Sequence, residues 1–114
     1  MMKHLKLVVN NENKKSVFFF NKKELKSILN LYAKMVSSGE WKDYGLSISK
    51  KEVSFNVYSR TSEFPAYKII KNLKPKNEDK KYLITNNQNK IINHSENLEY
   101  LIKQITWKKF KLVN

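Results

Sequence analysis

Residues 20–45, FNKKELKSILNLYAKMVSSGEWKDYG, decide how this chain begins to fold. Asn21 is a good helix N-cap, because its side-chain oxygen can accept from an unpaired amide of the first turn. Glu24 stands three residues later, where its carboxylate can accept from the Asn21 amide and complete a capping box. Phe20 and Leu25 occupy the two positions of a hydrophobic staple. The stretch therefore predicts a helix that begins directly after Asn21.

The apolar residues of this helix recur with the 3.6-residue period of a single helical face. The predicted buried stripe consists of Leu25, Ile28, Leu29, Tyr32, Met35 and Val36. Gly39 suits the left-handed position just past a helix end. Residues 40–45 then place two aromatic rings and two carboxylates close together. This composition predicts a compact corner after the helix.

About five short strands and a second helix are predicted after the corner. Residues 52–60 alternate apolar and polar side chains, which indicates a half-buried antiparallel strand. Ser95 is the predicted cap of the final helix. Its apolar stripe is Leu98, Leu101, Ile102 and Ile105. The other predicted strands are 46–49, 66–73, 82–85 and 90–93, with a charged loop at 74–81 and an asparagine-rich hairpin turn at 86–89.

These elements predict an α+β fold, in which two amphipathic helices pack on one face of an antiparallel sheet of about four to five short strands. A length of 114 residues fits one domain, expected at 16–114 after a flexible arm at 1–15. The absence of cysteine excludes disulfides and thiolate metal sites. No apolar run has the length of a membrane span, so we expect a soluble cytoplasmic protein.

The net charge of +13 is the strongest compositional signal. Such a charge favours polyanionic partners, either nucleic acid or an acidic protein surface. The chain is also rich in asparagine, and lysine and asparagine share A-rich codons. An A/T-rich genome would therefore enrich both without any binding role. The single arginine, Arg60, agrees with this alternative, because arginine dominates the reading of bases.

The candidate nucleic-acid surface is the polar face of the sheet together with the charged loop. Tyrosines that alternate with cations can stack bases and hold phosphates. The alternative is that the tyrosines pack beneath the helices or against neighbouring strands. The predicted contact residues are Tyr58, Arg60, Lys68, Lys71, Lys74, Lys76, Lys80 and Lys81.

The corner offers a second hypothesis, a protein–protein adaptor or a homodimer. Its interface would consist of Glu40, Trp41, Asp43 and Tyr44, since tryptophan and tyrosine anchor interfaces. The two carboxylates could also form an acid–base pair, but a domain of this size has little room for the deep cleft that such catalysis needs. We expect the carboxylates to neutralise lysines, and Trp41 to fill the core.

Motifs for metal, cofactor or covalent chemistry are missing. His4 and His94 have no partners at ligand spacing. The chain contains no glycine-rich phosphate loop and no G-x-S-x-G motif. We therefore expect no metal, no cofactor, no catalytic residues and a non-enzymatic role.

Three stretches carry a family resemblance, namely 20–46, 55–71 and 82–105. Their shared patterns are FN-x-x-EL, Y-x-x-MV, GEW-x-DY and SE-x-P. Together they resemble a small uncharacterised alphaproteobacterial family, a domain of unknown function, over about residues 18–112. The family has no established activity, so the resemblance implies a coherent small cytosolic fold. Compared with that family, this chain has less arginine, and it has Asn and Gln where the later hairpin carries Gly, which supports the codon explanation for part of the charge.

Overall fold

The computed structural model describes residues 20–59 and 64–105. The predicted arm at 1–15, with His4, and the predicted contact residue Arg60 lie outside these ranges. The described elements are α2 (Lys22–Ser37), β1 (Asp43–Ile48), β2 (Glu52–Tyr58), β3 (Tyr67–Asn72), the short 3₁₀ helix η2 (Glu78–Lys80), β4 (Tyr82–Thr85), β5 (Ile91–Ser95) and α3 (Leu98–Gln104).

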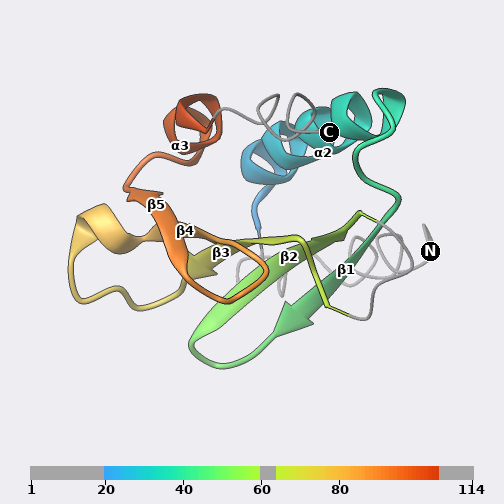
Figure 1. Ribbon diagram of the computed structural model, residues 1–114. Coiled ribbons are helices and arrows are strands. Elements are labelled where there is room, and N and C mark those ends of the chain that lie inside the picture. The colour runs from blue at the N-terminus through green and yellow to red at the C-terminus, as the bar shows by residue number, and fades with distance from the viewer. Residues whose placement is uncertain (1–19, 60–63, 106–114) are drawn as a thin grey trace.

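The five strands form one antiparallel sheet in the order of the sequence, β1-β2-β3-β4-β5. Both helices lie on the same side of this sheet (Figure 1). This arrangement confirms the predicted α+β class and the predicted meander. Short connections explain the order, because consecutive antiparallel strands pair most simply with their neighbours in sequence.

Helix α2 begins and ends as predicted. Asn21 and Glu24 form the complete capping box. The helix ends at Ser37, and Gly39 adopts a φ of 83°, the left-handed conformation that a glycine tolerates best.

Five residues of the predicted stripe of α2 lie in the core or at its margin, but the centre of the buried face is rotated from the prediction. Val36 is 40% exposed, whereas Glu24 and Leu31 are buried beside Ile28 and Met35. The helix turns the row 24, 28, 31 and 35 toward the sheet, because Glu24 has polar partners there. Leu25, Leu29 and Tyr32 are half-buried at the margin of the core.

The core lies between the helices and the sheet. Each element contributes apolar side chains to it at the spacing of its own period. The core consists of Phe20, Ile28, Leu31, Met35, Trp41, Tyr44, Val53, Phe55, Val57, Tyr67, Ile69, Tyr82, Ile84, Leu98 and Leu101.

Strand β2 is buried on both faces, although its alternation predicted a half-buried strand. Val53, Phe55 and Val57 face the helices, and the intervening Ser54 and Asn56 are also buried. The Ser54 hydroxyl donates to the Asn56 side-chain oxygen, and the Asn56 Nδ2 donates to Ser47 Oγ at 3.0 Å. These hydrogen bonds allow polar side chains to be buried at little cost.

The second helix is shorter than predicted and has a different cap. Asn97 caps α3 by accepting from the Tyr100 amide at 2.8 Å, whereas Ser95 ends β5 and accepts from the Asn97 amide. Ile105 lies at the end of α3, beyond its last turn. None of the described helices is both long and apolar enough to cross a membrane.

Candidate functional site

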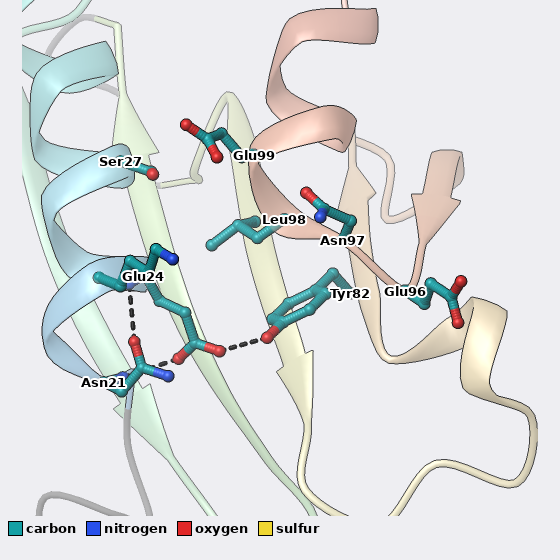
Figure 2. Close-up of a pocket in the computed structure, with 9 residues that line it drawn as sticks. Asn21, Glu24, Ser27, Tyr82, Glu96, Asn97, Leu98 and Glu99 are labelled. Atoms are coloured by element: carbon teal, nitrogen blue, oxygen red, sulfur yellow. Dashed lines mark hydrogen bonds between the residues drawn. The ribbon is translucent and has the colours of Figure 1, made fainter.

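A buried polar cluster joins the start of α2 to the middle of the sheet. Glu24 is 8% exposed, and its Oε1 lies 2.8 Å from Lys71 Nζ on β3. Its other oxygen, Oε2, accepts from the Tyr82 hydroxyl on β4. The Asn21 amide also donates to Oε1 at 2.7 Å. Figure 2 shows Glu24 reaching from α2 toward Tyr82. The capping residue is therefore also the residue that connects the helix layer to two strands.

The hydrogen bonds keep the Glu24 carboxylate ionised. Burial by itself raises the pKa of Glu24, but the hydrogen bonds from Lys71, Tyr82 and the Asn21 amide and the Lys71 charge outweigh it, so the pKa lies below its ordinary value. The pKa of Tyr82 is raised, first by burial and then by its bond to this anion. Both carboxylate oxygens already accept from the chain, so the cluster stabilises the fold.

A polar cavity of about 200 Å³ lies beside this cluster, between the first turns of α2 and α3. Glu99 and Ser27 face each other across it in Figure 2. The lining residues are Asn21, Lys23, Glu24, Ser27, Tyr82, Glu96, Asn97, Leu98 and Glu99. In the described part of the chain, no group of three His, Asp or Glu side chains could hold a metal ion. The Nδ1 of His94 is instead 2.8 Å from the Asp79 carbonyl oxygen, which it can reach as a donor.

The described residues of the predicted nucleic-acid surface lie in different parts of the sheet and its loops. Lys71 lies on the helix side of β3 and is paired with Glu24. Lys68 is half-buried and points to the opposite side, since side chains alternate along a strand. Tyr58 is the last residue of β2. The four remaining described residues of the prediction, Lys74, Lys76, Lys80 and Lys81, lie together in the loop between β3 and β4.

A second lysine-bearing turn lies beside that loop. The Leu73 amide donates to the Lys51 carbonyl oxygen at 2.8 Å, which fixes the β1–β2 turn against the start of the β3–β4 loop. In Figure 1 the β3–β4 loop, with η2, lies at the left, and the β1–β2 turn lies at the bottom. We call this surface the lysine end. It consists of Lys50, Lys51, Lys74, Lys76, Lys80 and Lys81.

The lysine end carries an excess of positive charge. Five of its six lysines are exposed, and Lys81 is half-buried with its Nζ 5.5 Å from the centre of the Tyr82 ring. None of the six forms an ion pair within the described residues. The β3–β4 loop contains two carboxylates, Glu78 and Asp79, and a third, Glu52, directly follows the β1–β2 turn. Lysines therefore outnumber acids at this end two to one. The field at this end favours an anionic ligand.

Hydrogen bonds hold the base of the β3–β4 loop and its η2 end. The Asn72 amide donates to the Lys81 carbonyl at 2.7 Å, and the Asn72 side chain donates to the Lys80 carbonyl at 2.6 Å. The contact between His94 and the Asp79 carbonyl ties η2 to β5. These bonds fix the backbone at Asn72 and around Asp79, Lys80 and Lys81 before any ligand arrives.

The predicted corner belongs to the core and to β1. Trp41 is 3% exposed and Tyr44 is 8% exposed, which confirms the expectation that Trp41 fills the core. The Tyr44 and Phe55 rings stack with their centres 4.9 Å apart. Glu40 is half-buried, and Asp43 is exposed at the start of β1. An interface at these four residues stays a prediction, and a partner would meet Asp43 before either ring.

The sequence of residues 18–102 matches the model of a family described as a protein of unknown function, DUF2794. The chain belongs to this family. The match confirms that the chain is a domain of unknown function; the alphaproteobacterial distribution stays a prediction. No curated protein and no solved structure matches the chain.

The region that matches the family model contains both Glu24 and the lysine end. The sequence predicts Glu24 only as a capping residue, and Lys50 and Lys51 are not among the predicted contact residues. The position of Glu24 could have indicated its burial, because it stands four residues before Ile28 and therefore on the same face of the helix. For the two lysines the signal was weaker, because their place beside the loop depends on strand pairing.

Proposed function

We propose that this chain is a non-enzymatic binding module for nucleic acid, which it holds by the phosphate backbone at the lysine end. The observation that carries this proposal is the hydrogen bond between Leu73 and Lys51, because it brings two lysine-bearing segments together. Lysines that neutralise phosphates release condensed counterions, which drives binding without reading the sequence.

The ordered loop supports the same proposal. A binding surface loses less entropy on association when its backbone is already fixed. The bonds at Asn72 and His94 fix the base and the η2 end of the β3–β4 loop in the free protein. Five of the six lysines of the lysine end are exposed, so phosphate can reach them.

Tyr58 lies at the far end of β2 from the lysine end, so it does not stack a base of nucleic acid held there. Tyr58 ends β2, whereas the lysine end adjoins Glu52 at the start of that strand. A strand of this length separates them by about 20 Å, since each residue rises about 3.3 Å. The ligand contacts are therefore expected to be phosphate contacts.

The first experiment is a titration of labelled DNA and RNA over a series of salt concentrations. Six phosphate contacts predict a slope of about −4 to −5 in log affinity against log salt. Titrations of both nucleic acids that stay flat at low salt would contradict the proposal.

A matched pair of variants separates a defined site from net charge. The test variant K50Q/K51Q/K74Q/K76Q removes four charges from the lysine end. We expect the slope of log affinity against log salt to become shallower by about 3. The control K26Q/K34Q/K90Q/K103Q removes four exposed charges from α2, the β4–β5 turn and α3. Equal weakening by both variants would show that total charge, rather than the lysine end, determines binding.

A further inference from the structure

Glu24 is connected to the lysine end through the two strands from which the loop leaves. Lys71 on β3 and Tyr82 on β4 are cross-strand partners, and they form the last pair before the loop. Glu24 accepts from both of these side chains. Residues 72–81 lie entirely between them in sequence.

The connection continues from Tyr82 to the lysines. Lys81 Nζ lies over the Tyr82 ring at 5.5 Å from its centre, an arrangement that attracts the cation to the ring face. Glu24 fixes the hydroxyl of the same ring. Beside it, the Asn72 amide closes the base of the loop on the Lys81 carbonyl at 2.7 Å.

We propose that Glu24 is the positioning residue of the lysine end, because its carboxylate fixes the Lys71–Tyr82 pair and thereby sets where the lysines of the β3–β4 loop stand. The expected effect of Glu24 on binding rests on the proposed function. Its structural part, the ordering of the loop by Glu24, does not need a ligand.

Charge and position make opposite predictions for one substitution. E24Q keeps the size of the side chain and an oxygen for the capping box, but it makes the protein one unit more positive. Electrostatics alone would tighten binding to a polyanion. Positioning predicts that E24Q weakens binding to a short DNA duplex by about three- to tenfold, because the loop must be ordered on association.

E99Q is the matched control. Glu99 is exposed on α3 and lines the same cavity, and its substitution changes the net charge identically. We expect E99Q to bind the duplex as well as the wild type or more tightly. Tighter binding by both E24Q and E99Q would overturn the positioning role.

Y82F tests the connection without any change of charge. It removes only the hydroxyl that donates to Glu24, and we expect duplex affinity to fall in the same direction as in E24Q. Amide hydrogen exchange gives a second readout. Exchange at Asn72 and Leu73 is expected to accelerate in Y82F, whereas exchange at Phe55 and Ile69 in the core stays unchanged.

The exchange data separate the two proposals. If the wild type binds no nucleic acid, the proposed function fails, and faster exchange at Asn72 and Leu73 in Y82F still supports the ordering of the loop by Glu24. Unchanged exchange at both amides would overturn that ordering, whether or not nucleic acid binds.

Discussion

The carboxylate of Glu24 on α2 lies 2.8 Å from the ammonium group of Lys71 on β3, and both side chains are nearly excluded from solvent. A pair of this kind gains little over apolar packing, because both charges lose hydration. Removal of one partner is costly, since the charge that remains buried loses the opposite charge of this pair. The pair therefore gives the helix a defined position on the sheet, and its loss has measurable consequences.

Glu24→Ala is expected to lower the free energy of unfolding by about 3 kcal/mol, because it removes the carboxylate that accepts from Lys71 and Tyr82 and half of the capping box. Urea denaturation at neutral pH measures this change. Glu99→Ala is the control, and a substitution at this exposed site should stay within about 0.5 kcal/mol. Similar losses in the two variants would contradict the role of the buried pair.

Acid should remove the contribution of ionised Glu24 to the free energy of unfolding. Its pKa in the folded protein lies below the ordinary value of 4.5, so the unfolded chain takes up this proton first as the pH falls. The contribution is complete above about pH 4.5 and is lost progressively below it. In urea denaturation, we expect the difference in free energy of unfolding between the wild type and E24Q to become smaller as the pH falls below about 4.5. A gap that stays constant with pH would contradict the lowered pKa.

Alkali should act through Tyr82. Its pKa in the folded protein lies above the ordinary value of 10.0, because burial and the Glu24 anion disfavour the phenolate. The unfolded chain therefore loses the proton first, and stability falls as the pH rises above about 10. Thermal denaturation should show a shallower alkaline decline in Y82F than in the wild type. Identical declines would exclude a raised pKa at Tyr82.

Trp41→Ala is expected to destabilise the fold by about 3–5 kcal/mol, the usual cost of removing a large aromatic side chain from a core. Trp41 is 3% exposed and lies near the Tyr32 and Tyr67 rings, with centres 6.2 and 6.3 Å away. Tyr100→Ala, at a ring that is 57% exposed, provides the comparison and should cost far less. Chemical denaturation of both variants decides the matter, and a small effect at Trp41 would contradict its place in the core.

The β4–β5 turn makes a conformational prediction. Asn89 has a φ of 61°, which residues other than glycine and asparagine rarely adopt. Asn89→Val is expected to cost about 1–2 kcal/mol, while Asn89→Gly should be close to neutral. Thermal denaturation of the two variants tests whether Asn89→Val is less stable than Asn89→Gly. Equal stability of Val and Gly at this position would show that the turn relaxes to another conformation.

Local sequence signals were sufficient for the elements of the fold. The capping box at Asn21, the left-handed Gly39 and the asparagine-rich turn are each determined within a few residues, because the groups that satisfy one another are neighbours in the chain. The meander followed from short connections between consecutive strands. Local signals were weaker where two possible capping residues stand close together in the sequence. At the start of α3 the cap is Asn97, not the predicted Ser95.

Only the tertiary structure decided that Glu24 is buried, that β2 is covered on both faces and which lysines lie together. Periodicity gave an apolar stripe on α2, but the helix turned Glu24 inward, because Lys71 and Tyr82 supply a cation and a hydroxyl from strands far along the chain. Lys51 and Leu73 meet because β2 pairs with β3 and brings their turns to the same end of the sheet. The sequence by itself determined the cap, the strands and their order, whereas the buried ion pair and the lysine end required the register between strands, which depends on contacts that no local pattern contains.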